Sequence, residues 1–183
     1  MALRSTIFKA EVQVSDVDRG YYAAHALTIA RHPSETDERL MVRLLAFCLH
    51  ASARLEFGRG ISADEEADLW ERDDTGAILL WIEVGMPDER ALRKACGRSD
   101  AVEVLAYGRG VDPWWRGIER DLARLPKLRV RSLAPALTQA LAAMAQKSMH
   151  IDCTIQDGAV WISGEEERIE IAFTTLLERP SAD

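Results

Sequence analysis

The sequence of 183 residues has few of the features that identify metal-rich, disulfide-rich or membrane proteins. Its three cysteines are an odd number, widely spaced and outside any CxxC pair, which indicates reduced, mostly buried thiols rather than a disulfide framework or a zinc ribbon. The four histidines lack the spacing of metal ligands. Apolar runs are far shorter than the roughly 20 residues of a membrane span, and the N-terminal residues alternate polar and apolar side chains, unlike a signal peptide. We therefore expect a soluble, cytoplasmic protein with no membrane partner.

Positive charge is outnumbered by negative charge. The chain has 23 Lys and Arg residues against 30 Asp and Glu residues, which gives a formal net charge of -7. This balance disfavours a protein that coats nucleic acid by charge alone, although it leaves room for a local basic groove. We find no internal repeat, low-complexity segment or long linker, and a chain of this length buries roughly 70% of its unfolded surface. The sequence therefore predicts one domain over residues 1–183.

Apolar residues recur along the chain with two periods, which predict strands and helices respectively. The helical period predicts a long helix over residues 35–56, with Ser34 as its cap. The expected strands are residues 5–16, 21–31, 68–72, 77–84, 101–107, 127–133, the two arms of a hairpin over 149–164 turned at Asp157-Gly158, and 168–178; the other expected helices are 87–96, 112–125 and 134–146. Because strands and helices interleave, we expect an α/β fold with a mixed β-sheet and helices packed on it.

One of these strands ends in a carboxylate. Residues 77–82 are all apolar, which predicts a central strand buried on both faces, and Glu83 follows them directly. An ionised carboxylate is costly to bury unless it is paired or coordinates a cation. Glu83 therefore requires a partner, and in the simplest case it caps or pairs with the helix that follows it.

The turn that precedes this strand places a second carboxylate beside Glu83. If Thr75-Gly76 forms a two-residue turn, Asp68 lies directly across from Glu83 on the same face of the hairpin. A three-residue loop would place Ala67 there instead. Two adjacent carboxylates repel, and the common solutions are a shared proton, a nearby Lys or Arg, or a hard divalent cation. This pair is the reason to expect a metal site at the hairpin.

Two further residues are candidates for the same site. Lys94 lies on the polar face of the helix over 87–96 and could reach back toward Glu83, although such a face is usually solvated. Glu38 is the best third carboxylate, because it lies in the first turn of the long helix and could point over the sheet.

Several segments together cover most of the chain and carry a family resemblance. They read MALRSTIFKAEVQVSDVDR, ARHPSETDERLMVRLLAF, LEFGRG, DDTGAILLWIEVGMPDERALRKACGR and TIQDGAVWIS. Nearly end to end, they resemble the YaeQ family of bacterial proteins. The resemblance implies a fold that varies on the PD-(D/E)XK nuclease core. In that core a hairpin supplies an Asp and an acidic residue two positions before a Lys, and a preceding helix often adds a Glu.

The resemblance assigns motif positions to the candidate residues. Asp68 would fill the position of the Asp, and Glu83 that of the second acidic residue. Glu38, or less readily Glu35, would be the Glu of the preceding helix.

The sequence departs from the motif at two positions. Ala67 stands where the motif has Pro, and Gly85 stands where it has Lys, so the Lys role would fall to Lys94 of the next helix. The implied function is metal-assisted hydrolysis of phosphodiesters in nucleic acid. Asp68 and Glu83 would hold Mg²⁺ or Mn²⁺, and Lys94 would orient the attacking water or stabilise the developing charge. The alternative is a non-catalytic protein that keeps the fold and binds a protein or nucleic acid. The missing Lys and the net acidity favour this alternative, whereas the carboxylate pair at the hairpin favours the enzyme.

Overall fold

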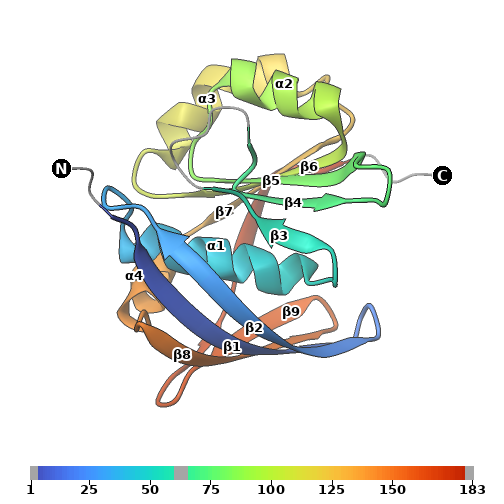
Figure 1. Cartoon of the computed structure of the whole chain (residues 1–183). Helices are drawn as coiled ribbons and strands as arrows, with labels where there is room; N and C mark the ends of the chain where they lie inside the picture. The colour runs from blue at the N-terminus through green and yellow to red at the C-terminus, as the bar shows by residue number, and fades with distance from the viewer. Residues whose placement is uncertain (1–3, 60–65, 180–183) are drawn as a thin grey trace.

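The computed structural model describes residues 4–59 and 66–179, which form two β-sheets and four helices (Figure 1). The strands are β1 (Thr6–Asp16), β2 (Tyr21–Arg31), β3 (Leu55–Phe57), β4 (Leu69–Arg72), β5 (Ile78–Val84), β6 (Ser99–Tyr107), β7 (Leu128–Leu133), β8 (Ser148–Gln156), β9 (Ala159–Ser163), β10 (Arg168–Glu170) and β11 (Phe173–Leu177). The helices are α1 (Asp37–His50), α2 (Glu89–Arg98), α3 (Val111–Leu122) and α4 (Pro135–Ala143).

The first sheet has the strand order β10-β9-β8-β1-β2 and contains both predicted terminal hairpins. β1 and β2 pair antiparallel in one continuous register, starting from Thr6 opposite Arg31. β8 lies parallel to β1 and forms a hairpin with β9. This second hairpin turns at Asp157-Gly158, where the φ angles of 53° and 77° are those that a tight two-residue turn requires.

The second sheet has the order β11-β7-β6-β5-β4-β3. β5 is an interior strand, as predicted, with β4 antiparallel on one side and β6 parallel on the other. β7 continues the parallel arrangement beyond β6. The C-terminal ends of β5, β6 and β7 therefore lie along one edge of this sheet.

Residues 168–178 do not form the single strand that their alternation predicts. β10 pairs with β9 in the first sheet, and β11 pairs with β7 in the second. Ile171 lies between them, is buried, and donates its N–H to the Val160 carbonyl oxygen at 2.8 Å. Alternation predicts that a segment is extended, but it does not predict which strand will be its partner. The fold is α/β with mixed sheets, as expected, but it has two of them.

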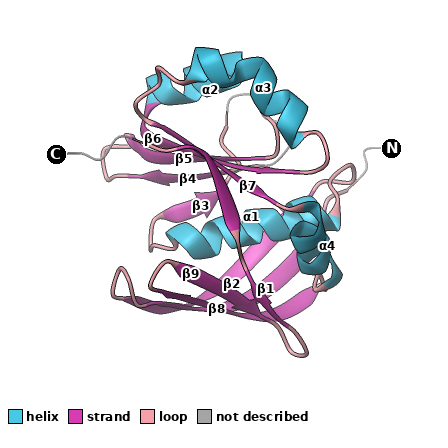
Figure 2. Cartoon of the chain, turned by 180° about the vertical axis from the view of Figure 1, so that it is seen from behind, coloured by secondary structure: helices cyan, strands magenta, loops and turns pink. Residues whose placement is uncertain are grey.

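α1 lies between the two sheets and forms the centre of the core (Figures 1 and 2). Every residue from Leu40 to Leu49 is buried. The main apolar cluster joins Val12 of the first sheet, Phe47 of α1 and Ile82 of the second sheet. α2 and α3 cover the other face of the second sheet with a separate apolar cluster, and α4 packs against α1.

The ends of α1 differ from the prediction. The helix begins at Asp37, and the Thr36 hydroxyl caps it by accepting the Arg39 N–H at 3.1 Å, so Ser34 is not the cap. The helix ends at His50, and Leu55 belongs to β3. Leu55 continues the helical spacing of apolar residues because both the helix and β3 contribute to the same core. Apolar spacing alone therefore extended the predicted helix too far.

The three cysteines are free and buried, as predicted. Among the described residues, no helix is long and apolar enough to cross a membrane.

Candidate functional site

The turn of the β4–β5 hairpin differs from the predicted two-residue turn at Thr75-Gly76. The Asp73 N–H donates to the Ala77 carbonyl oxygen at 3.0 Å, so three residues form the loop. A three-residue loop by itself would place Ala67 opposite Glu83. The hairpin also contains a β-bulge next to the loop, which adds one residue to β5 and shifts the register by one position.

The bulge restores the predicted alignment of the two strands. Trp70 lies opposite Trp81, as expected, and the same register continued past β4 makes Asp68 and Glu83 the pair that follows Leu69 and Ile82. Both carboxyl groups therefore lie where β5 ends, beside the C-terminal end of β6. This edge of parallel strands is where α/β sheets commonly bind ligands.

Asp68 is buried, and both of its carboxylate oxygens accept hydrogen bonds. Oδ2 accepts the backbone N–H of Val84 at 2.7 Å, and Oδ1 accepts a hydrogen bond from Nη2 of Arg39. Arg39 also donates from Nη1 to the Val84 carbonyl oxygen at 2.6 Å. Arg39 of α1 thus forms an ion pair with Asp68 and a hydrogen bond with Val84 at the end of the β4–β5 hairpin.

Glu83 is half-buried beside Asp68, and its pKa is raised to about 8. Burial is the main cause, and the negative charge of Asp68 and a hydrogen bond between the two carboxyl groups add to it. The hydrogen bond from Trp81 Nε1 to Glu83 Oε1 (2.6 Å) and the positive charge of Arg39 lower the pKa, but by less. Glu83 is therefore largely protonated at neutral pH. The structure brings the two carboxyl groups together, while their roles in catalysis and metal binding stay predictions.

Arg39 lies beside Gly85, the residue that the family resemblance aligns with the Lys position of the PD-(D/E)XK motif. Gly85 occupies that position with a φ of 107°, a conformation that favours glycine over lysine. A Cβ atom built on Gly85 would lie 3.4 Å from Nη1 of Arg39. Arg39 of α1 thus brings a positive charge next to the end of β5.

Other polar side chains surround this charged contact. Tyr107, at the end of β6, has its pKa raised by burial, and its hydrogen bond with Arg39 opposes that shift. Glu35 Oε1 lies 3.8 Å from Arg39 Nε and 2.8 Å from Arg43 Nη1. Glu35 and Arg43 are both buried, so they form an interior ion pair that holds the start of α1 in place.

Glu38 does not join the Asp68–Glu83 pair. Its Oε1 accepts a hydrogen bond from the Thr138 hydroxyl at 2.5 Å, which ties α1 to α4. Among residues 4–59 and 66–179, no group of three or more His, Cys, Asp or Glu side chains is placed to hold a metal ion. The expected third carboxylate is therefore not assembled with the other two.

Lys94 is exposed on α2, whereas a side chain that reached back to Glu83 would be partly buried. Sequence reasoning missed Arg39 as the cation beside the carboxyl pair. Arg39 and Arg43 lie four residues apart in a helix that is otherwise strongly apolar, and basic residues in such a helix require acidic partners. That spacing was the available signal.

The donor chemistry of the pair fits a hard divalent cation with one condition. Mg²⁺ commonly uses one or two protein carboxylates and completes its coordination with water and phosphate oxygens. Asp68 and Glu83 supply two carboxyl groups, but the pKa of Glu83 is near 8 and Asp68 already accepts two hydrogen bonds. Binding of an ion therefore requires that Glu83 lose its proton.

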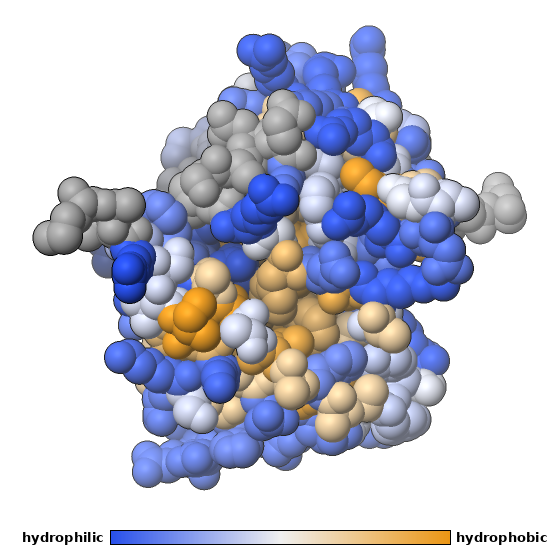
Figure 3. Space-filling model, in the orientation of Figure 1, coloured by the Kyte–Doolittle hydropathy of each residue, from blue (hydrophilic) through white to orange (hydrophobic). Residues whose placement is uncertain are grey.

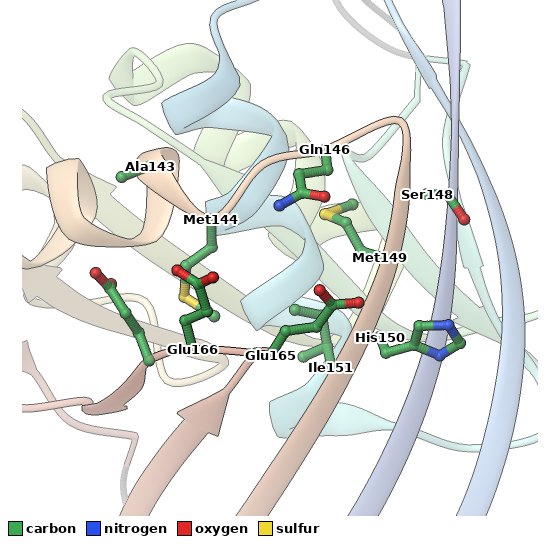
Figure 4. A pocket seen from close by; sticks show the side chains of 11 residues that line it. Ala143, Met144, Gln146, Ser148, Met149, His150, Ile151, Glu165 and Glu166 are labelled. Carbon is green, nitrogen blue, oxygen red and sulfur yellow. The ribbon is translucent and has the colours of Figure 1, made fainter.

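A separate pocket of about 170 Å³ lies between the end of α4, the start of β8 and the segment that joins β9 to β10 (Figure 4). Its lining includes Glu165, Glu166 and Glu167 together with Met144 and Met149. Three carboxylates in its lining would repel a phosphate group. The pocket includes none of the residues of the carboxyl pair.

Comparison with known proteins gives consistent results over nearly the whole chain. The family model described as YaeQ protein matches residues 1–173. The chain is 45% identical to the uncharacterized protein YaeQ of Salmonella typhi and 42% identical to that of Escherichia coli (strain K12), in each case over 99% of this chain and 100% of the relative.

Two crystal structures are also similar. The YaeQ protein from Xanthomonas axonopodis pv. citri has a TM-score of 0.91 and 49% identity, covering 96% of this chain and 99% of that one. The YaeQ protein from Pseudomonas syringae has a TM-score of 0.92 and 34% identity, covering 96% and 97%. The chain therefore belongs to the YaeQ family.

Proposed function

We propose that the chain hydrolyses phosphodiesters in nucleic acid with Mg²⁺ or Mn²⁺, and that Asp68 and Glu83 are the metal ligands. The observation that carries this proposal is the position of Arg39. Its guanidinium contacts Asp68 and lies beside Gly85, so it places a positive charge next to the carboxyl pair where the motif Lys is missing. The order of α1, the β4–β5 hairpin, α2 and the parallel strand β6 supports a nuclease-like core.

Asp68, Glu83 and Arg39 would have separate roles in this reaction. A bound divalent cation polarises a phosphoryl oxygen and lowers the pKa of a bound water. Asp68 and the ionised form of Glu83 would hold the cation. Arg39 would donate hydrogen bonds to the phosphoryl oxygens and stabilise the negative charge that develops on them, because a guanidinium binds such oxygens strongly. Lys94 is assigned no step, because its side chain is exposed on α2.

Cleavage assays test this proposal with a matched pair of variants. Asp68 is buried in the site, whereas Asp74 is exposed at the tip of the same hairpin. With Mn²⁺ and either supercoiled plasmid or short single strands, we expect wild type and Asp74→Asn to cut equally. Asp68→Asn should cut at least about 100-fold more slowly. Cleavage at the wild-type rate by Asp68→Asn would contradict the proposal, because the activity would then not depend on Asp68.

A second candidate function has its own supporting observation. Arg39 and the Val84 N–H already satisfy Asp68, and Glu83 holds a proton, so the pair is complete without a cation. This arrangement favours a protein that keeps the fold and binds a partner without catalysis. If wild type cuts neither substrate with Mg²⁺ or Mn²⁺ at any pH between 7 and 9, this alternative should replace the first.

A further inference from the structure

β2 is a long edge strand without the protection that edge strands normally have. It pairs with β1 alone and runs for 11 residues at the end of the first sheet. Residues 20–30 contain no Asp, Glu, Lys, Arg or Pro. Its register with β1 is continuous, so no bulge bends the edge away. Natural sheets usually protect an edge by one of these devices, because unpaired backbone groups recruit other strands.

The other sheet edges in the described part of the chain are short. β3 and β10 have three residues each and β11 has five. β3 and β10 also carry charged residues. One side chain reaches the backbone near the C-terminal end of β2, where Arg43 Nη1 donates to the Ala30 carbonyl oxygen at 3.4 Å. Of these four edge strands, β2 therefore has the longest edge, and its residues up to Ala30 carry no Asp, Glu, Lys or Arg.

The side chains of β2 up to Ala30 carry no Asp, Glu, Lys or Arg and are incompletely covered. On the face toward α1, Tyr21, Ala23, His25 and Leu27 are half-buried, and on the other face Tyr22 is 61% exposed. Figure 3 shows apolar residues gathered on the surface over β2 and between it and the second sheet. Contacts beneath fix the half-buried row in place. The Tyr21 hydroxyl lies 2.9 Å from His25 Nε2, and His25 packs edge-on against a Phe of α1.

We infer that β2 pairs antiparallel with β2 of a second copy of the chain, about a two-fold axis at Ala24, and joins the two first sheets into one. The backbone edge requires a β-strand as its occupant, and this strand complements itself. Pairing about Ala24 sets the exposed Tyr22 against Ala26 and the half-buried Tyr21 against Leu27, so bulky side chains meet smaller or apolar ones. The interface is isologous, and no like charges meet along residues 20–30.

Charge complementation at the two-fold axis tests the inference. Ala24→Lys sets two ammonium groups against each other, and Ala24→Glu sets two carboxylates together, so each variant should weaken dimerisation at least about tenfold. An equal mixture of the two variants should dimerise again, because Lys then faces Glu. Gln13→Lys is the matched control, since Gln13 is the exposed residue beside Ala24 on β1. It should leave the dimer intact.

Sedimentation equilibrium measures the result directly. Wild type should have twice the chain mass of 20.4 kDa at about 100 µM. A wild type that stays monomeric would overturn the inference, as would an Ala24→Lys variant that remains dimeric. Hydrogen exchange on wild type avoids dependence on variant folding. Slow exchange of the β2 amides should be lost on dilution, and exchange that does not change with concentration would also overturn the inference. The result is independent of the nuclease proposal, because the β2 edge includes no residue of the carboxyl pair.

Discussion

Glu83 holds its proton at neutral pH because burial and the charge of Asp68 raise its pKa to about 8, from an ordinary value of 4.5. Between these two pH values the folded chain keeps a proton that the unfolded chain has lost. The free energy of unfolding should therefore be highest below about pH 4.5, as far as this group contributes, and should fall as pH rises toward 8.

Glu83→Gln removes this titration and keeps the shape of the protonated side chain. We expect its free energy of unfolding to exceed that of wild type at pH 8.5 by roughly 1 to 3 kcal/mol, and to match wild type more closely at pH 5. Urea unfolding at both pH values measures the difference. An equal difference at the two pH values would show that Glu83 does not titrate in this range.

Arg39 is the partner of a buried carboxylate, so its removal should be costly. Arg39→Gln leaves the charge of Asp68 without its guanidinium, and we expect a loss of about 3 kcal/mol in the free energy of unfolding at pH 7. Arg54→Gln provides the control, because Arg54 pairs with the exposed Asp74 and should cost less than about 0.5 kcal/mol. Similar losses in both variants would mean that the Arg39 contact is no stronger than a surface ion pair.

Substitution of Lys94, in contrast to that of Arg39, should change stability little. Its side chain is exposed on α2, and substitutions at exposed positions usually change stability by less than about 0.5 kcal/mol. Lys94→Ala should therefore leave both the melting temperature and the Mn²⁺ affinity close to those of wild type. A Lys94→Ala variant with much weaker Mn²⁺ binding would restore Lys94 to the metal site.

At the scale of the element, α1 depends on its N-terminal cap. The Thr36 hydroxyl accepts the Arg39 N–H, whereas the Ser34 hydroxyl lies 2.7 Å from His32 Nδ1 and caps nothing. Thr36→Ala should cost about 1 kcal/mol of stability, and Ser34→Ala should cost less than about 0.5 kcal/mol. Thermal unfolding of the two variants separates them, and a larger loss for Ser34→Ala would restore the cap predicted from the sequence.

Periodicity predicted most of the elements, but it did not predict how they end or pair. The turn of the β8–β9 hairpin at Asp157-Gly158 was predicted correctly, because the local residues alone determine a tight turn. The β4–β5 register was also correct, although two deviations from the expected turn, a longer loop and a bulge, cancelled each other. Both deviations are local backbone adjustments that leave no distinct mark in a pattern of apolar residues.

At the scale of the whole molecule, two sheets enclose α1, and this arrangement creates the candidate site. The carboxyl pair could be predicted because Asp68 and Glu83 belong to one hairpin. The contact of Arg39 with that hairpin could not, because it depends on how α1 packs against the end of β5. Sequence patterns carry strong local information, whereas a contact between distant elements depends on the packing of the complete fold.

The central claim is that Asp68 and Glu83 bind a divalent cation when Glu83 loses its proton. Calorimetric titration of wild type with Mn²⁺ at pH 6.5 and 8.5, in two buffers of different ionisation enthalpy, tests it most directly. We predict affinity that rises by roughly tenfold per pH unit below the Glu83 pKa of about 8, with release of up to one proton per ion, and no such binding by Asp68→Asn. Absence of Mn²⁺ binding by wild type at pH 8.5, or equal binding by Asp68→Asn, would contradict the claim.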